Sequence, residues 1–333
     1  MGRLFLLLIC SGMLAACAAR DPLVARDLDR SHLPAPDRSV SIAGLGPCTD
    51  NPDRRLMLQA GQPVTVLVHG CFGSSGQFRA LAQVLALQGQ QSACFTYDDR
   101  AALDDVAGEL RNAVMQLGAQ TDSSRITVIG HSQGALVGRK AMTDSPELLA
   151  LPAAPTDWRL VTISGPFSGI DAARTCGRTW LFPLTLGLLP LSCHAFTGAK
   201  WADITFSSRF IVEPGRLAPG VEHLKIDTDE RGSCRHQRDG RCLESDYIFS
   251  LDEQRNAKVD ADPQVDRVEV DAGHVEIVGD KQRVPTKLLA ILQDKGVLRP
   301  VSSQRRGEFE RLVAEVYAPG PSSPIVPFDR VLP

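Results

Sequence analysis

The stretch Arg125-Ile126-Thr127-Val128-Ile129-Gly130-His131-Ser132-Gln133-Gly134 decides the fold. Its first five residues are rich in β-branched side chains and predict a buried strand, and Ala135 to Met142 predicts a helix. Between them lies the pattern Gly-x-Ser-x-Gly, which places a serine on a sharp turn from strand to helix. The two glycines relieve the crowding at such a turn. The positive N-terminus of the helix then favours an anion beside Ser132.

Strands and helices alternate on both sides of this turn. The patterns predict strands at 64–68, 92–97, 125–129, 158–163, 222–226 and 265–270, and helices at 78–87, 103–117, 135–142 and 308–317. The run Val64-Thr65-Val66-Leu67-Val68 suits a strand that is buried on both faces. This alternation predicts an α/β domain with a mostly parallel central sheet flanked by helices.

Composition narrows the class of protein. The chain has 333 residues, of which 43% are hydrophobic and 23% charged, an ordinary balance for a globular protein. Its formal net charge is -3, and it has no basic stretch that would suggest a nucleic-acid partner.

The N-terminus predicts export. Arg3 precedes the apolar run Leu4-Phe5-Leu6-Leu7-Leu8-Ile9, and Leu14-Ala15-Ala16-Cys17 follows, as in a secretory signal. The last four residues resemble a bacterial lipobox. That resemblance implies cleavage after residue 16, acylation of Cys17 and anchoring in the bacterial cell envelope; the alternative is an ordinary signal in which Cys17 is incidental. Residues 17–46 then read as a tether to the membrane, 47–300 as the main domain and 301–333 as a C-terminal helix with a Pro-rich tail.

Export permits disulfides. The nine cysteines are Cys10, Cys17, Cys48, Cys71, Cys94, Cys176, Cys193, Cys234 and Cys242. We expect Cys234 and Cys242 to close a small hairpin within an insertion at 228–245, and Cys176 and Cys193 to close a larger loop. Cys48, Cys71 and Cys94 leave one thiol unpaired, with the pairing open. No second Cys pair or His pair stands at zinc-finger spacing, so no metal site is predicted.

The turn and its surroundings resemble bacterial lipases of the α/β-hydrolase superfamily. Ile129-Gly130-His131-Ser132-Gln133-Gly134-Ala135-Leu136-Val137-Gly138-Arg139 is similar to their nucleophile elbow and following helix, and Thr162-Ile163-Ser164-Gly165-Pro166-Phe167-Ser168-Gly169 to the segment after their next strand. The similarity covers roughly 64–274. It departs at Ala135, where glycine is commoner, at Phe167, where histidine is usual, in the Cys234–Cys242 insertion, and throughout 171–206. The resemblance implies the α/β-hydrolase fold.

A serine nucleophile needs a base and an acid that orients the base. In this fold the chain order is Ser, then Asp or Glu, then His. Only His274 follows both the last predicted strand and every candidate acid. For the acid we favour Asp246, because Ser245-Asp246-Tyr247-Ile248-Phe249-Ser250 resembles the acid loop of many hydrolases, and place Asp229 second.

The oxyanion site is inferred from the first strand. His69-Gly70-Cys71-Phe72-Gly73 resembles the oxyanion loop of lipases. That resemblance implies backbone N–H donors at Cys71 and at Gln133, the residue after the nucleophile. A disulfide from Cys71 to Cys48 or Cys94 would stiffen the loop.

These residues together predict a serine hydrolase that cleaves hydrophobic carboxylic esters through an acyl-serine intermediate, with no cofactor. A thioesterase or acyltransferase on the same triad, or a non-catalytic binding protein of this fold, remain alternatives. The apolar segment 171–206 is expected to form a lid over an acyl pocket; the alternative is an insertion that only packs. Oligomeric state is not indicated by the sequence.

Overall fold

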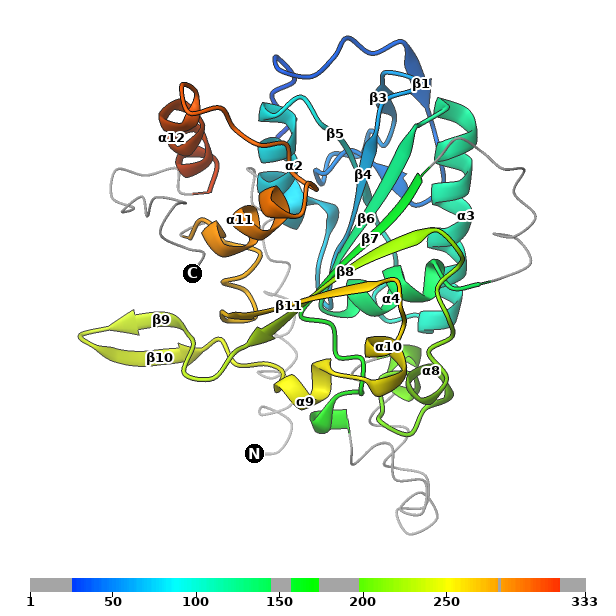
Figure 1. Ribbon diagram of the computed structural model, residues 1–333, viewed down its shortest axis with the longest axis vertical. Helices are drawn as coiled ribbons and strands as arrows, with labels where there is room; N and C mark the ends of the chain where they lie inside the picture. The colour runs from blue at the N-terminus through cyan, green and yellow to red at the C-terminus, as the bar shows by residue number, and fades with distance from the viewer. Residues whose placement is uncertain (1–25, 145–156, 174–197, 281–282, 318–333) are drawn as a thin grey trace, which may run out of the picture.

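A seven-stranded sheet forms the centre of the protein (Figure 1). The computed structural model describes residues 26–144, 157–173, 198–280 and 283–317. The strands run in the order β11-β8-β7-β6-β4-β5-β2. Their bounds are β2 (Leu45–Gly46), β4 (Val64–Val68), β5 (Gln91–Phe95), β6 (Arg125–His131), β7 (Asp157–Ile163), β8 (Val221–Asp229) and β11 (Val265–Asp271).

The strand pairing confirms the predicted fold class. All neighbouring strands pair in parallel except β2, which runs antiparallel to β5 at one edge. The six strands expected from the sequence are the six parallel ones. This order, with a strand–serine–helix turn after the central β6, is that of the α/β-hydrolase fold. In such sheets functional residues gather where the parallel strands end.

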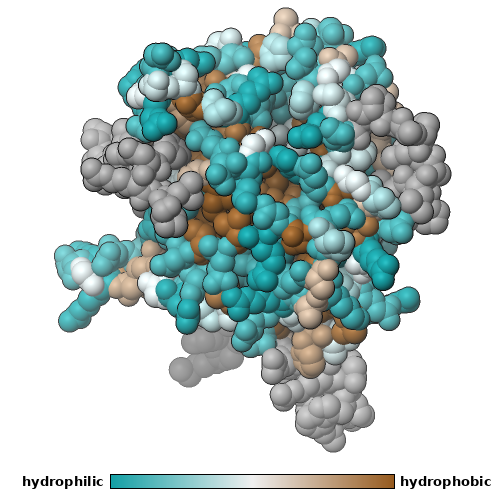
Figure 2. Space-filling model, viewed as in Figure 1, coloured by the Kyte–Doolittle hydropathy of each residue, from teal (hydrophilic) through white to brown (hydrophobic). Residues whose placement is uncertain are grey.

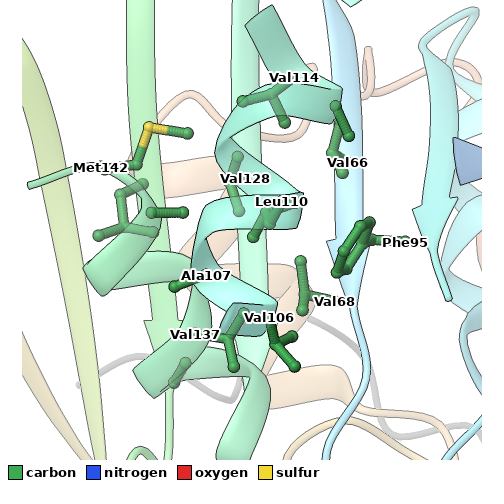
Figure 3. Packing of buried hydrophobic residues seen from close by; sticks show 14 of the residues in the cluster. Val66, Val68, Phe95, Val106, Ala107, Leu110, Val114, Val128, Val137 and Met142 are labelled. Carbon is green, nitrogen blue, oxygen red and sulfur yellow. The ribbon is translucent and has the colours of Figure 1, made fainter. Parts of the chain in front are cut away.

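Helices α3 (Leu103–Thr121) and α4 (Gln133–Ala141) cover one face of the sheet. Val66 and Val68 of β4 pack there against Leu110 and Val114 of α3 (Figure 3). All four side chains are at most 1% exposed. The helix predicted at 103–117 therefore packs on the sheet through an apolar face that includes Val106, Leu110, Val114 and Leu117.

Helices α2 (Arg79–Leu87), α11 (Thr286–Asp294) and α12 (Arg306–Tyr317) cover the other face. Leu67 of β4 belongs to this second core, because neighbouring residues of a strand point to opposite faces. Phe309 and Val313 anchor α12 in the same cluster. In the space-filling view the surface is largely hydrophilic, with apolar side chains showing mainly near the middle of the face (Figure 2).

Shorter elements decorate the sheet. Strands β1 (Arg38–Val40) and β3 (Leu56–Leu58) form an antiparallel pair, and β9 (Cys234–Arg238) and β10 (Arg241–Ser245) form a hairpin that projects from the body (Figure 1). The remaining elements are η1 (Ser75–Phe78), η2 (Asp171–Ala173), η3 (Ala199–Ala202), α8 (Arg209–Val212), α9 (Leu251–Gln254) and α10 (Ala257–Asp260).

The predicted tether at 17–46 is wrong for its last part. Residues 38–40 form β1 and residues 45–46 form the edge strand β2. Val40, Ile42 and Leu45 are buried in the core with α3. These strands are two and three residues long, too short for a period-of-two pattern to reveal them.

Several predictions fall outside the described residues. The signal and Cys17, the Cys176–Cys193 pair, most of the lid-like segment 171–206 and the tail after residue 317 are among them. Among the helices that are described, none combines the length and apolar character needed to cross a bilayer.

The burial of His223 predicts that the folded protein is less stable in acid. His223 is 1% exposed in β8, with Nε2 2.8 Å from Oγ1 of Thr162, and burial lowers its pKa well below the usual 6.5. Below pH 6.5 the unfolded chain therefore binds a proton that the folded chain refuses. The free energy of unfolding should fall there, by up to about 1.4 kcal/mol per pH unit from this group.

The substitution His223→Gln keeps a polar side chain that can bond to Thr162, but it removes the imidazole that binds a proton. Urea unfolding from pH 8 to pH 5 should give a shallower decline for the variant than for the wild type. Parallel declines would contradict the assignment.

Candidate active site

Ser132 occupies the turn between β6 and α4. Its backbone angles are φ 57° and ψ -125°, a conformation that L-residues rarely adopt. Such strain persists only where the surroundings over-determine it. The Ser132 N–H donates to the carbonyl of Ile163 on β7 at 2.9 Å, and its carbonyl accepts from Ala135 at 3.0 Å. The turn is thus held from both sides.

The glycines of the motif are needed for space. A Cβ on Gly130 would lie 2.2 Å from the carbonyl oxygen of Gly134, and one on Gly134 would lie 2.2 Å from that of Val68. Both neighbours are backbone atoms that cannot move aside. The spacing of the motif therefore follows from how closely α4 approaches β6 and the end of β4.

His274 follows β11 and lies against the elbow. Its ring centroid is 4.6 Å from that of His131, and its backbone carbonyl lies 2.9 Å from Nε2 of His131. Burial, and secondarily the neighbouring His274, lowers the pKa of His131 well below its usual range. His131 is therefore neutral, and its Nε2–H donates to that carbonyl. The structure brings the predicted base to the residue next to Ser132.

The carboxylate at the imidazole is Glu230. Its Oε1 lies 2.9 Å from Nδ1 of His274, and its side chain is fully buried. Oε1 also accepts from Oγ1 of Thr228 at 3.2 Å, while Oε2 accepts from the N–H groups of Ile248 at 2.5 Å and Phe249 at 2.8 Å. These contacts hold the Glu230 carboxylate in a fixed orientation.

The predictions of Asp246 and Asp229 as the partner of His274 are wrong in this geometry. The Asp246 carboxylate accepts from the N–H groups of Val275 at 3.1 Å and Glu276 at 2.9 Å, and its backbone carbonyl accepts from the N–H of His274 at 3.0 Å. Asp246 therefore fixes the turn that carries His274, not its ring. Asp229 forms an ion pair with Arg231, which lowers the pKa of Asp229 to about 2.

Glu230 was missed because the predicted strand ended at Ile226, four residues before it. Strand β8 continues to Asp229 instead of ending at Ile226, so Asp227 and Asp229 share one face and Thr228 and Glu230 share the other. The hydrogen bond from Thr228 to Glu230 reflects this shared face. Glutamate was an allowed acid for this position, since the fold uses either Asp or Glu.

The segment after β4 abuts the serine. A Cβ on Gly70 would lie 2.9 Å from Cβ of Ser132 and 3.4 Å from its Oγ. The N–H of Gln133 is an orphan donor by its place at the start of α4. Cys71 has a free, exposed thiol, whereas Cys48 and Cys94 form a disulfide. Cys71 therefore forms a disulfide with neither Cys48 nor Cys94, the two partners considered for it.

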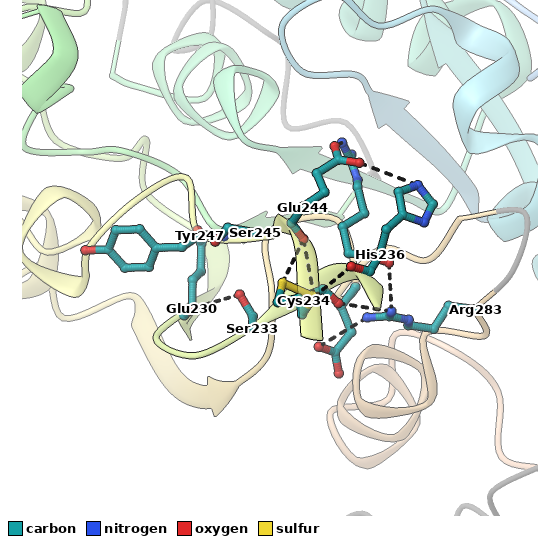
Figure 4. Close-up of a disulfide and its surroundings, with 11 residues drawn as sticks. Glu230, Ser233, Cys234, His236, Glu244, Ser245, Tyr247 and Arg283 are labelled. Carbon is teal, nitrogen blue, oxygen red and sulfur yellow. Dashed lines mark hydrogen bonds and ion pairs between the residues drawn. A yellow bond between two sulfur atoms is a disulfide. The ribbon is translucent and has the colours of Figure 1, made fainter. Parts of the chain in front are cut away.

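The second disulfide joins Cys234 and Cys242 across the hairpin, as predicted (Figure 4). The base of the hairpin lies beside the acid: Oγ of Ser233 donates to the carbonyl of Glu230 at 2.6 Å. The guanidinium of Arg283 donates to the carbonyls of Cys234 and Arg235 at 3.2 and 3.3 Å. These bonds tie the projecting hairpin to the body next to the candidate site.

Among the described residues, no group of three or more His, Cys, Asp or Glu side chains could hold a metal ion. Nucleophile, base, acid and backbone donors can all come from the chain itself.

Comparison with known proteins gives distant likenesses. No protein-family model matches the chain. Over 117 residues it is 32% identical to a triacylglycerol lipase of Pseudomonas fragi; the alignment covers 32% of this chain and 36% of the lipase. The match therefore spans little more than a third of that relative's length.

Among solved structures, a mature lipase of Bacillus licheniformis has a TM-score of 0.46 at 15% identity, over 70% of this chain and 91% of that one. An esterase of Pyrococcus furiosus has a TM-score of 0.41 at 17% identity, over 83% and 90%. Esterase B of Lactobacillus Rhamnosis has a TM-score of 0.45 at 13% identity, over 93% of this chain and 95% of the esterase. The strand order and the turn at Ser132 define the fold.

Asp246 predicts a stability effect. Asp246→Ala removes the acceptor of two N–H groups in the turn of His274 and should lower the free energy of unfolding by about 1–3 kcal/mol. Asp229→Ala is the matched control, because its ion pair with Arg231 is exposed and such pairs contribute about 0–1 kcal/mol. Urea denaturation measures both, and equal losses would contradict the positioning role.

Proposed function

We propose that the protein is a serine hydrolase that cleaves carboxylic esters through an acyl-serine intermediate. One observation carries the proposal: a fully buried carboxylate, Glu230, holds Nδ1 of His274, a histidine packed against the residue before Ser132. A strained serine, an imidazole and a buried carboxylate together are the parts of a catalytic triad.

The chemistry follows from which atoms are already engaged. Nδ1 of His274 donates its proton to Glu230, so Nε2 is left as the base. Nε2 takes the proton of Ser132 as Oγ attacks the ester carbonyl, and returns it to the departing alcohol. Water then attacks the acyl-serine by the same route. Glu230 stays ionised throughout, and stabilises the imidazolium that forms.

Hydrogen-bond donors must stabilise the negative charge of the tetrahedral intermediate. In the proposal these are the backbone N–H groups of Cys71 and Gln133. Gly70 lies against Ser132, and Gln133 opens α4, whose N-terminus favours an anion. Each such donor contributes a factor of about 10²–10³ in kcat in related chemistry.

The substrate class proposed is a hydrophobic acyl ester. The partial identity with a triacylglycerol lipase supports it. Phe72, next to the oxyanion loop residue Cys71, is 78% exposed. Large apolar side chains left in solvent beside a candidate site suit an apolar ligand.

The triad is tested by three substitutions. Ser132→Ala should abolish both hydrolysis of p-nitrophenyl butyrate and labelling by a fluorophosphonate. Glu230→Gln should lower kcat by about 10⁴-fold, because a neutral amide no longer fixes the imidazole in its working tautomer. Asp229→Asn, one residue away on the opposite face of β8, should leave kcat unchanged.

Normal fluorophosphonate labelling of Ser132→Ala would rule out the nucleophile. A larger loss in Asp229→Asn than in Glu230→Gln would rule out the acid.

We also propose that the mature chain is anchored in the bacterial cell envelope through acylated Cys17. Leu14-Ala15-Ala16-Cys17 supports this, and each buried CH₂ of an acyl chain contributes about 0.8 kcal/mol to membrane binding.

The anchor is tested in cells that express the full chain. Wild-type protein should incorporate labelled palmitate and partition into detergent, and Cys17→Ser should do neither. Cys71→Ser serves as the control, since it removes a different free thiol. Soluble, unlabelled wild-type protein would contradict the anchor.

A further inference from the structure

A buried ion pair underlies the loop proposed to bind the oxyanion. Nζ of Lys200, from η3, lies 3.0 Å from Oδ2 of Asp99, in the loop after β5. The Lys200 side chain is 1% exposed and that of Asp99 is 19% exposed. A buried charge is costly unless it is paired, so the two groups hold each other in place.

Asp99 contacts the residue after one proposed oxyanion donor, Cys71, and the side chain of the other, Gln133. Its Oδ2 accepts from the N–H of Phe72 at 2.8 Å, the peptide directly after Cys71. Its backbone carbonyl accepts from Nε2 of Gln133 at 3.2 Å. One residue thus joins the loop after β4 to the start of α4.

Lys200 adds contacts to the same loop. Its Nζ lies 2.6 Å from Sγ of Cys71 and 5.1 Å from the ring centroid of Phe72. The backbone of η3 is fixed as well, because the N–H of Ala199 donates to the carbonyl of Arg100 at 2.7 Å. The short helix η3 therefore positions the Lys200 ammonium group, and η3 is itself hydrogen-bonded to the loop that carries Asp99.

The backbone of Phe72 needs such support. It has φ 56°, in the left-handed region that a non-glycine residue rarely adopts. A residue of this kind costs about 1–3 kcal/mol and persists only when its surroundings hold it. The bond from its N–H to Asp99 is the contact that fixes the peptide beside Cys71.

We propose that Asp99 is a positioning residue of the oxyanion site, with Lys200 holding its carboxylate against the N–H of Phe72. Asp99 touches no reacting atom; it orients the peptide of Cys71 toward the developing charge. This rests on the proposed esterase function and adds to it a residue pair outside the triad.

A matched pair of double variants tests the proposal without leaving a buried charge unpaired. Asp99→Leu with Lys200→Met removes both charges and the acceptor for Phe72. Asp99→Asn with Lys200→Met removes both charges and keeps a side-chain oxygen that can accept from that N–H. The two differ only in whether residue 99 can hold the loop.

For p-nitrophenyl butyrate, the first variant should lose about 10²-fold in kcat with KM within about threefold of wild type, as when one oxyanion donor is displaced. The second should recover most of that loss. Affinity for a trifluoromethyl ketone, which forms an anionic adduct with Ser132, should fall in step with kcat. Lys295→Met, which breaks the Lys295–Asp266 pair at the opposite end of the sheet, is the control and should change neither quantity.

Equal kcat values for the two double variants, or a loss confined to KM, would overturn the positioning role. Either result leaves the esterase proposal standing if Ser132→Ala is inactive. Activity in Ser132→Ala would instead overturn the function on which the inference rests.

Discussion

The close approach of α4 to the ends of β4 and β6 sets the geometry of this protein. At Gly134 the helix backbone comes so near the Val68 carbonyl that even one carbon atom has no room. That contact forces the sharp turn at Ser132, and the turn directs the start of α4 at the serine. The loop after β4 is drawn to the same point, with Gly70 against Ser132. The positions of the candidate nucleophile and of the candidate oxyanion donors therefore follow from one packing constraint.

Two acidic residues, one on each side of the hairpin, hold different parts of His274 and its turn. Glu230 bonds to the ring, whereas Asp246 bonds to the backbone of the turn that carries the ring. Both are buried, at 1% exposure, and both are saturated with donors. A ring held only by its carboxylate could tilt, and a turn held only by its backbone would leave the tautomer free. Together they fix the position of the ring and of the turn that carries it, as the proposed general base requires.

How much could be predicted from the sequence depends on the range of the interaction. The central strands, helix α3 and the elbow follow from local periodicity and a short motif, which are properties of neighbouring residues, and His274 follows from its place after the last strand. Glu230 was missed because the polar run Asp227-Thr228-Asp229 looks like the end of a strand. Distant partners keep it extended: Arg267 pairs with Asp227, and Gln254 accepts from the N–H of Thr228. No sequence pattern within Asp227-Thr228-Asp229 predicts those partners.

The hairpin between Glu230 and Asp246 shows how such an insertion can lie beside the candidate site. The chain leaves the sheet after Glu230 and must return Asp246 to the turn of His274. Closing a flexible loop costs entropy, and a crosslink reduces that cost by restricting the unfolded chain. The Cys234–Cys242 bond closes the hairpin, and Ser233 at its base donates to the Glu230 carbonyl and accepts from the N–H of Asp246. The insertion therefore ends as a paired stem, and that stem sets the spacing of the two carboxylates that serve one histidine.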